Sequence, residues 1–290
     1  MTARVVLKEW RRGRWLRARG RGIGGTDAAA ILGHHKWSTP LDVWLSKTGR
    51  AEPTPSSYPM ARGNALEAFL LAEYGRQTGA IVERPPALLA HPDHPELVAS
   101  LDGLAHHRDR TVVVDAKTVG HRGAGVWWDE ERMCPDMYAV QMLHYLAVTG
   151  LEEAVLVADV AGDYTEVTIS RDRAWEAAAL PLLVRWWAEH VVADTPPPAD
   201  WERDSIPALN RAWVPEPGTR IEASDAVAGA VQAWRALTPA HKERGKTLDA
   251  LRVQIREGMG TAQVLTIGGA KAAALDSRGV LRVTQPKEEA

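Results

Sequence analysis

Leu97-Val-Ala-Ser-Leu-Asp-Gly-Leu104 is followed, after a short polar segment, by Thr111-Val-Val-Val-Asp-Ala-Lys-Thr118. Both runs are apolar, rich in β-branched residues and too short for helices, and the polar segment between them is typical of a turn. The pair therefore predicts an antiparallel β-hairpin. Because side chains alternate along a strand, Asp115 and Lys117 are expected on one face, with Ala116 turned toward the core.

Two carboxylates belong to this hairpin. Asp102 is expected near Asp115 across the hairpin, and two such charges repel unless a cation lies between them. Oxygen ligands without His or Cys favour Mg²⁺ or Mn²⁺ over zinc. A lysine placed like Lys117 can hold a water beside the metal and offset negative charge in a phosphoryl-transfer transition state. An Asp-x-Lys triplet alone is more often a solvated strand face, so the prediction depends on its surroundings.

The composition is that of an ordinary globular protein, with 290 residues, 45% hydrophobic and 25% charged. This length allows one elaborated domain or a domain with an appendage. Cys134 is the single cysteine, which excludes a disulfide framework and fits a reducing cytosol. No apolar run approaches the ~20 residues of a transmembrane helix. We therefore expect a cytoplasmic protein without membrane contacts, in a bacterial or phage-infected cell.

The distribution of charge is more informative than the net charge of −2. Residues 1–22 contain eight basic residues and one acid, Glu9, a local balance of about +7 of the kind that follows phosphates. The basic residues are Arg4, Lys8, Arg11, Arg12, Arg14, Arg17, Arg19 and Arg21. A basic approach to an acidic site is the pattern of a metal-dependent nuclease.

A glycine-rich turn follows the basic segment. Glycines 22, 24 and 25 interrupt the chain, Thr26 or Asp27 is expected to cap a helix, and residues 28–32 begin that helix. Free backbone N–H groups at such a turn suit an anion. The spacing is not that of a P-loop or a dinucleotide fingerprint. A flexible capped turn without a ligand is the alternative.

Residues 61–79 predict a helix that ends at a glycine C-cap, Gly79. Its inward side chains are expected to be Leu66, Phe69, Leu70 and Tyr74. Glu67 lies at the core-facing edge, where an unpaired carboxylate is costly. It is therefore expected to meet an arginine such as Arg62 or to join the metal cluster.

Three further helices are expected at residues 40–47, 135–150 and 171–192, with a β-hairpin at residues 153–169. Gln141 and Tyr145 lie one turn apart on the second of these helices and share a face. The Gln141 amide suits a phosphate or a water, although a surface glutamine is the default. Residues 51–59 are a Pro/Ser loop that we expect to form a flap over the site.

The proline run Thr195-Pro-Pro-Pro198 marks a boundary. It divides the chain into a nuclease domain with a basic N-terminal segment (residues 1–194), a Pro-rich linker (195–221) and an appendage (222–290). Residues 223–259 of the appendage predict helix, interrupted at Pro239, and small antiparallel strands follow.

Five motifs now stand in order along the chain: Gly22-Ile-Gly-Gly-Thr-Asp-Ala-Ala, Gly63-x-x-x-Glu67, Asp102-Gly, Asp115-x-Lys117 and Gln141-x-x-x-Tyr145. Together they resemble the YqaJ-like viral recombinase family, phage alkaline exonucleases of the lambda-exonuclease type within the PD-(D/E)XK superfamily. The resemblance spans roughly residues 9–192. It implies an α/β fold, with a restriction-endonuclease-like core in which helices flank a mixed central sheet.

The resemblance also implies an activity. Members degrade one strand of linear double-stranded DNA from 5′ to 3′ with Mg²⁺, often as a ring-shaped homotrimer around the duplex. Mn²⁺ is expected to substitute, and two ions per site are expected. The product carries a 3′ single-stranded tail for a phage single-strand annealing protein.

The site residues follow from the same motifs. Asp102, Asp115 and the carbonyl of Ala116 would be metal ligands, and Glu67 would hold a second metal or its water. Lys117 would position the attacking water. At the DNA end, Arg19 and Thr26 match positions that bind the 5′ phosphate. Gln141 would assist catalysis, and the further DNA-binding candidates are Arg21 and Tyr145.

Two departures from the family pattern bear on catalysis. The family more often has Glu-x-Lys where this chain has Asp115-x-Lys117, a shorter reach that bears on metal preference, and no proline precedes Asp102. An endonuclease of restriction or repair type is a second hypothesis, because the same core serves both activities. A catalytically silent DNA-binding or assembly protein is a third.

Overall fold

A computed structural model describes residues 3–8, 11–51, 57–121, 123, 134–199, 208–210, 217–218, 220, 222–259, 262–267, 270–275 and 281–283. Its contacts divide the chain into two compact units, Met1–Pro215 and Glu216–Ala290. Residues 52–56 of the expected flap lie outside the described residues. Within the described residues, no helix combines the length and the apolar character needed to cross a membrane.

The first unit is built on a five-stranded mixed sheet. Its strand order is β2 (Ile81–Glu83), β5 (Gly103–His106), β6 (Thr111–Val119), β7 (Glu153–Val160) and β8 (Asp163–Ser170). Strands β6 and β7 are parallel, and the other neighbours are antiparallel. Parallel neighbours need a crossover, which helix α6 (Asp136–Thr149) provides. The expected α/β fold with a mixed central sheet is confirmed.

The predicted hairpin forms between β5 and β6, with one correction. The first run does not continue as one strand, because β4 (Val98–Ala99) belongs to a separate small sheet with β3 (Leu88–Ala90) and β1 (Arg4–Leu7). Asp102 lies where the chain passes from β4 to β5. The β5–β6 ladder ends at the pair Gly103–Val114, whereas β6 continues to Val119.

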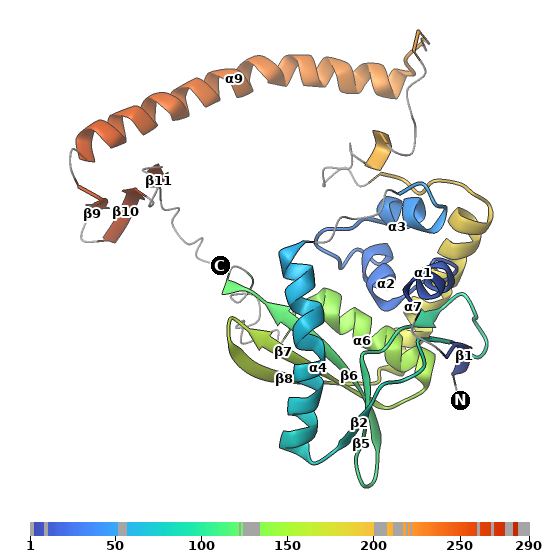
Figure 1. The fold of residues 1–290 in the computed structure, drawn as a ribbon. Coiled ribbons are helices and arrows are strands. Elements are labelled where there is room, and N and C mark those ends of the chain that lie inside the picture. Colours follow the sequence, from blue (N-terminus) through green and yellow to red (C-terminus); the bar gives the residue numbers. More distant parts are fainter. Residues whose placement is uncertain are drawn as a thin grey trace. The chain divides into compact units, whose positions relative to one another are not determined.

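Helices cover both faces of the sheet (Figure 1). Helix α4 (Tyr58–Thr78) packs Leu70 and Tyr74 against one face, and Val112 and Val114 of β6 point toward it. The alternate residue Val113 points to the opposite face, where α6 lies. The same side receives α2 (Gly25–Ile31), α3 (Pro40–Lys47) and α7 (Arg173–Trp186).

The helix ends follow local signals, with one correction at the start of α2, and one side chain of α4 is more exposed than predicted. Helix α3 has the predicted bounds, and α4 ends at Gly79, whose φ of 72° is left-handed. Helix α2 begins earlier than predicted. Its N-cap is Gly24 rather than Thr26 or Asp27, because the Asp27 carboxylate reaches back to the Gly24 N–H at 2.9 Å. Phe69 was expected inside but is 61% exposed.

Helix α1 (Arg12–Arg19) follows β1, and the π-helical segment η1 (Trp187–Val192) extends α7. The second unit contains α9 (Asp225–Met259), which continues through Pro239, so the predicted interruption there is wrong. A three-stranded antiparallel sheet follows, formed by β9 (Val264–Ile267), β10 (Ala270–Leu275) and β11 (Leu281–Val283). The functional division at residues 194 and 221 stays a prediction.

His144 makes the stability of the first unit depend on pH. Its side chain is fully buried in α6, and its Nε2 donates to the Val98 carbonyl of β4 at 2.9 Å. Burial disfavours the imidazolium and lowers the pKa of His144 to about 4. Between this value and about 6.5, the unfolded chain binds more protons than the folded chain, so acid favours unfolding.

We expect the free energy of unfolding of the wild type to fall by about 2 kcal/mol more than that of His144→Gln between pH 7 and pH 5. Glutamine keeps a donor for the Val98 carbonyl but does not titrate. Urea unfolding of both proteins at pH 7, 6 and 5 measures the difference, and groups common to both proteins cancel. A constant difference across this range would contradict the prediction.

Candidate active site

The site lies where β5 leaves β6. Beyond the Gly103–Val114 pair, β5 no longer offers a partner to the backbone of β6. The Asp102 carboxylate takes that place, because its Oδ2 accepts the Ala116 N–H at 3.0 Å. This bond replaces a ladder hydrogen bond with a carboxylate and holds Asp102 beside Asp115.

Asp115 and Lys117 project from the same face of β6, as the alternation predicts. Asp115 is only 1% exposed, and Lys117 Nζ donates to its Oδ2. From α6, Gln141 Nε2 lies 3.4 Å from Asp115 Oδ1 and donates to Tyr145 Oη at 2.8 Å. The predicted hairpin and helix residues are therefore brought together. Tyr145 is itself buried and accepts this hydrogen bond from Gln141, and its role in DNA binding stays a prediction.

The charges of this group are unbalanced. Burial raises the pKa of Asp115 to about 7, with Lys117 opposing this shift and Asp102 adding to it. Burial lowers the pKa of Lys117, but the charges of Asp115 and Asp102 outweigh it and raise the pKa above its usual value. Lys117 therefore stays an ammonium, and one ammonium faces two carboxyl groups.

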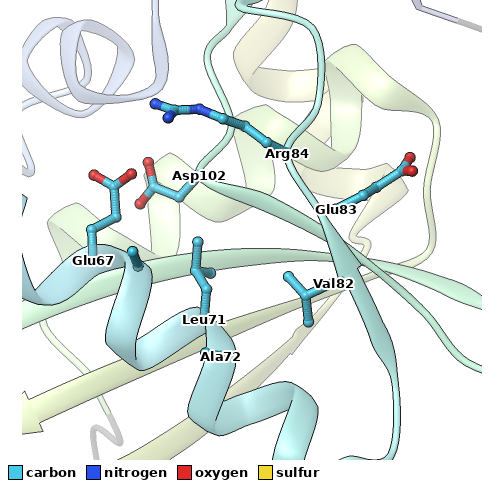
Figure 2. Close-up of a pocket in the computed structure, with 8 residues that line it drawn as sticks. Glu67, Leu71, Ala72, Val82, Glu83, Arg84 and Asp102 are labelled. Atoms are coloured by element: carbon cyan, nitrogen blue, oxygen red, sulfur yellow. The ribbon is translucent and has the colours of Figure 1, made fainter.

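A third carboxylate comes from α4. Figure 2 shows Glu67 and Asp102 pointing toward each other across a pocket. Burial and the charge of Asp102 raise the pKa of Glu67, whereas Arg84 and Lys117 lower it. The prediction that Arg62 pairs with Glu67 is wrong, because Arg62 Nη2 binds Asp159 Oδ2 at 3.1 Å. The arginine that faces Glu67 is Arg84.

A glycine permits this approach of α4 to the sheet. A Cβ at Gly103 would lie 3.1 Å from Leu71 Cδ2 and 3.2 Å from Val82 Cγ1. A larger residue at the start of β5 would therefore require the side chains of Leu71 and Val82 to shift by a few tenths of an ångström. Gly103 thus allows close packing beneath Glu67 and Asp102.

The donor set fits a hard divalent cation. Within the described ranges, no group of three His, Cys, Asp or Glu side chains forms a complete protein site for a metal ion. Mg²⁺ does not need one, because it commonly binds one or two carboxylates, waters and substrate phosphates. Asp102, Asp115 and the Ala116 carbonyl offer oxygens only, and the two neighbouring carboxylates repel each other until a cation lies between them.

The glycine-rich turn lies against this group. A Cβ at Gly25 would lie 2.8 Å from Gln141 Cγ and 3.0 Å from Tyr145 Cε1, so the start of α2 is pressed onto α6 beside Gln141. Thr26 follows directly, which places one predicted phosphate-binding residue next to the site. Arg21 is exposed in the same turn.

Arg19 is held close to this turn by its neighbours. Its guanidinium lies 5.2 Å from the centre of the Trp15 ring, and Trp15 Nε1 donates to Ser100 Oγ at 3.0 Å. Ser100 is two residues before Asp102. Helix α1 of the basic segment is therefore tied to the chain that carries the acidic site, although it buries no residue of its own.

The ion pair beneath the turn was not predicted from the sequence. Lys47 Nζ lies 2.6 Å from Asp27 Oδ2, with side chains only 4% and 16% exposed, and also donates to the Arg19 carbonyl at 3.3 Å. Burial raises the pKa of Asp27, but the charges of Lys47 and Arg19 and the bonds from Lys47 and Gly24 outweigh it. The carboxylate is therefore charged and joins α2, α3 and the Arg19 backbone.

The fold and the site define an α/β protein with a PD-(D/E)XK-type core. Its solved structural relatives include the alkaline exonuclease LHK-Exo from Laribacter hongkongensis, with a TM-score of 0.52 and 21% identity over 62% of this chain and 93% of that chain. The same protein in complex with dAMP gives a TM-score of 0.53 and 22% identity, over 69% and 97% of the two chains. At these identities, the likeness shows the fold.

The sequence comparisons add a likeness to one family. Residues 14–152 match the YqaJ-like viral recombinase domain. The chain is also 29% identical over 277 residues to the uncharacterized protein YqaJ of Bacillus subtilis strain 168, covering 93% of this chain and 86% of that protein. Residues 14–152 are therefore similar to the YqaJ-like viral recombinase domain, in agreement with the resemblance carried by the five motifs.

We expect Lys47→Met to destabilise the protein by about 3–5 kcal/mol, because it leaves the buried Asp27 carboxylate without its cation. Removing both charges in Asp27→Asn/Lys47→Met should cost less than the sum of the two single changes. Urea unfolding of the four proteins measures the coupling. Additive costs would show that the two side chains do not act as a pair.

Proposed function

We propose that this protein is a metal-dependent exonuclease that degrades one strand of linear double-stranded DNA from 5′ to 3′. The resulting 3′ single-stranded tails would serve a single-strand annealing protein in phage-type recombination in the cytoplasm. The family and the exonuclease fold support a nuclease of this kind. A ring-shaped homotrimer around the duplex is part of the proposal.

The observation that carries the proposal is the buried Asp115–Lys117 pair beside Asp102, at the opening where β5 leaves β6. Buried charges such as these, next to an open strand edge, are costly to maintain. Carboxyl groups with shifted pKa values also cluster at catalytic sites. The same opening is bordered by the glycine-rich turn and Gln141.

The side chains of this site have distinct chemical roles. Lys117 keeps its proton, so its Nζ donates to the attacking water or to a phosphate oxygen and stabilises charge that develops on the phosphate. Gln141, fixed by Tyr145, presents its amide beside Asp115 and orients the same phosphate or water. Asp102 and Asp115 with the Ala116 carbonyl would hold Mg²⁺ or Mn²⁺, and Glu67 a second ion. When bound, the metal polarises the phosphate and acidifies a coordinated water.

Arg19, Thr26 and Arg21 are proposed to bind the 5′ phosphate of the DNA end. The contact between Gly25 and Gln141 fixes the distance from the turn to the site, so the enzyme would cut a set distance from the end. An endonuclease does not need a pocket for a terminal phosphate, which favours the exonuclease over the restriction or repair hypothesis. The intact Asp102, Asp115 and Lys117 argue against a catalytically silent DNA-binding protein.

We expect Lys117→Ala to lower the rate of DNA degradation by about 100-fold or more, because it removes the cation at the developing phosphate charge. Linear duplex DNA labelled separately at each 5′ and 3′ end, with Mg²⁺ or EDTA, measures rate and polarity. Metal-dependent loss of the 5′ label first, with a covalently closed circle spared, is the expected result.

Circular dichroism controls for folding of the Lys117 variant. Cutting of the closed circle by the wild type would instead support the endonuclease. Binding of DNA without cutting at either end would support the silent DNA-binding protein.

We expect Arg19→Glu to lower the use of 5′-phosphorylated ends by about tenfold or more, and that of 5′-hydroxyl ends much less, because a charge-assisted contact to phosphate is lost. The matched control is Arg17→Glu, which makes the same charge change at an exposed position of α1. It should affect both ends equally. Equal losses on both ends for Arg19→Glu would contradict the phosphate assignment.

A further inference from the structure

Arg84 lies in the same pocket as Glu67 and Asp102 but belongs to none of the five motifs. The pocket has a volume of about 260 Å³ and an apolar floor that includes Leu71 and Val82. Figure 2 shows the Arg84 guanidinium on the side of the two carboxylates, while the neighbouring Glu83 points away. A cation therefore faces the acidic site from the segment that directly follows the edge strand β2.

The local sequence fixes this direction. Glu83 is paired with Leu104 at the end of β2, and its carboxylate binds His106 Nε2 at 3.0 Å, away from Glu67 and Asp102. Alternation then directs Arg84, like Val82, to the pocket side. Pro85 and Pro86 follow, and a residue before proline is restricted to extended backbone. Arg84 is therefore presented by a stiff segment.

The two cations of the site differ in exposure. Lys117 is bound to the buried Asp115 and is 19% exposed. Arg84 is exposed, and its charge lowers the pKa of Glu67. A phosphate that approaches the carboxylates of Glu67 and Asp102 meets repulsion on that wall, which a facing guanidinium reduces. A guanidinium suits this role because its planar donors bind two phosphate oxygens at once.

We propose that Arg84 binds a backbone phosphate of the strand being degraded, close to the cleaved bond, and so acts as a substrate-binding residue of this site. The proposal rests on the proposed nuclease function. The alternative is that Arg84 only offsets the charge of Glu67, without touching DNA. The two roles predict different effects on the reaction rate when a charge is removed from the DNA instead of from the protein.

The first test compares neutral linkages in the DNA with loss of the arginine. Duplexes carry one methylphosphonate at the first, second or third linkage from the 5′ end, and the first turnover is timed. At the linkage that Arg84 contacts, neutralisation should slow the wild type about tenfold or more and should not slow Arg84→Met further. Arg84→Lys should recover part of the rate. Arg76→Met removes an exposed arginine of α4 that binds Glu73, and it should behave as the wild type.

The second test needs no catalysis. Binding of a phosphorylated duplex end in EDTA, followed by fluorescence anisotropy at several salt concentrations, reports how many phosphates are contacted. Arg84→Met should reduce the slope of log K against log[salt] by about 0.9, the value for one contact. Arg76→Met should leave the slope unchanged.

Each result has a definite meaning. One result is that the wild type degrades linear duplex DNA, but Arg84→Met and the neutral linkage slow the reaction independently at every linkage, or Arg84→Met leaves the salt slope unchanged. Arg84 is then not a phosphate ligand, and only this inference is overturned. If the wild type neither binds nor degrades linear duplex DNA, the proposed function is overturned and this inference with it.

Discussion

The hydrogen bond from the Ala116 N–H to the Asp102 carboxylate is the constraint on which the site depends. It lets β5 leave β6 after Val114 without leaving a backbone donor unpaired, at a position where an unpaired donor costs about 1–3 kcal/mol. The same bond holds Asp102 next to Asp115 in spite of their repulsion. The opening in the sheet and the excess of negative charge therefore have one structural cause.

The other side chains reach this opening through close contacts at two glycines. Gly103 lets α4 approach the sheet and present Glu67 toward Asp102, and Gly25 lets α2 rest on Gln141. Neither helix is placed by the acidic group itself. The geometry of the site is therefore maintained by packing on both faces of the sheet, which keeps Asp102 close to both Asp115 and Glu67 in spite of the repulsion between their charges.

The sequence predicted what local pattern controls: the β5–β6 hairpin, the shared face of Asp115 and Lys117, the bounds of α3, and the glycine that ends α4. It did not predict what tertiary packing controls. The alternation of side chains predicts which face of a sheet a residue lies on, but not the point where a strand leaves its sheet. The sequence therefore did not predict that β4 belongs to a different sheet from β5. Ion-pair partners such as Lys47 with Asp27, and Asp159 rather than Glu67 for Arg62, depend on distances that no sequence spacing encodes.

Two buried ion pairs of the first unit, Asp115–Lys117 and Asp27–Lys47, have related roles. Buried ion pairs seldom increase stability over apolar packing, so their presence needs another reason. Asp115–Lys117 keeps an ammonium at the strand opening, and Asp27–Lys47 ties the glycine-rich turn to α3 and to the Arg19 backbone. One group supplies charge at the place of reaction, and the other fixes the turn beside it. Since Gly25 joins the two through Gln141, a shift in either group would alter the distance between the turn and the acidic site.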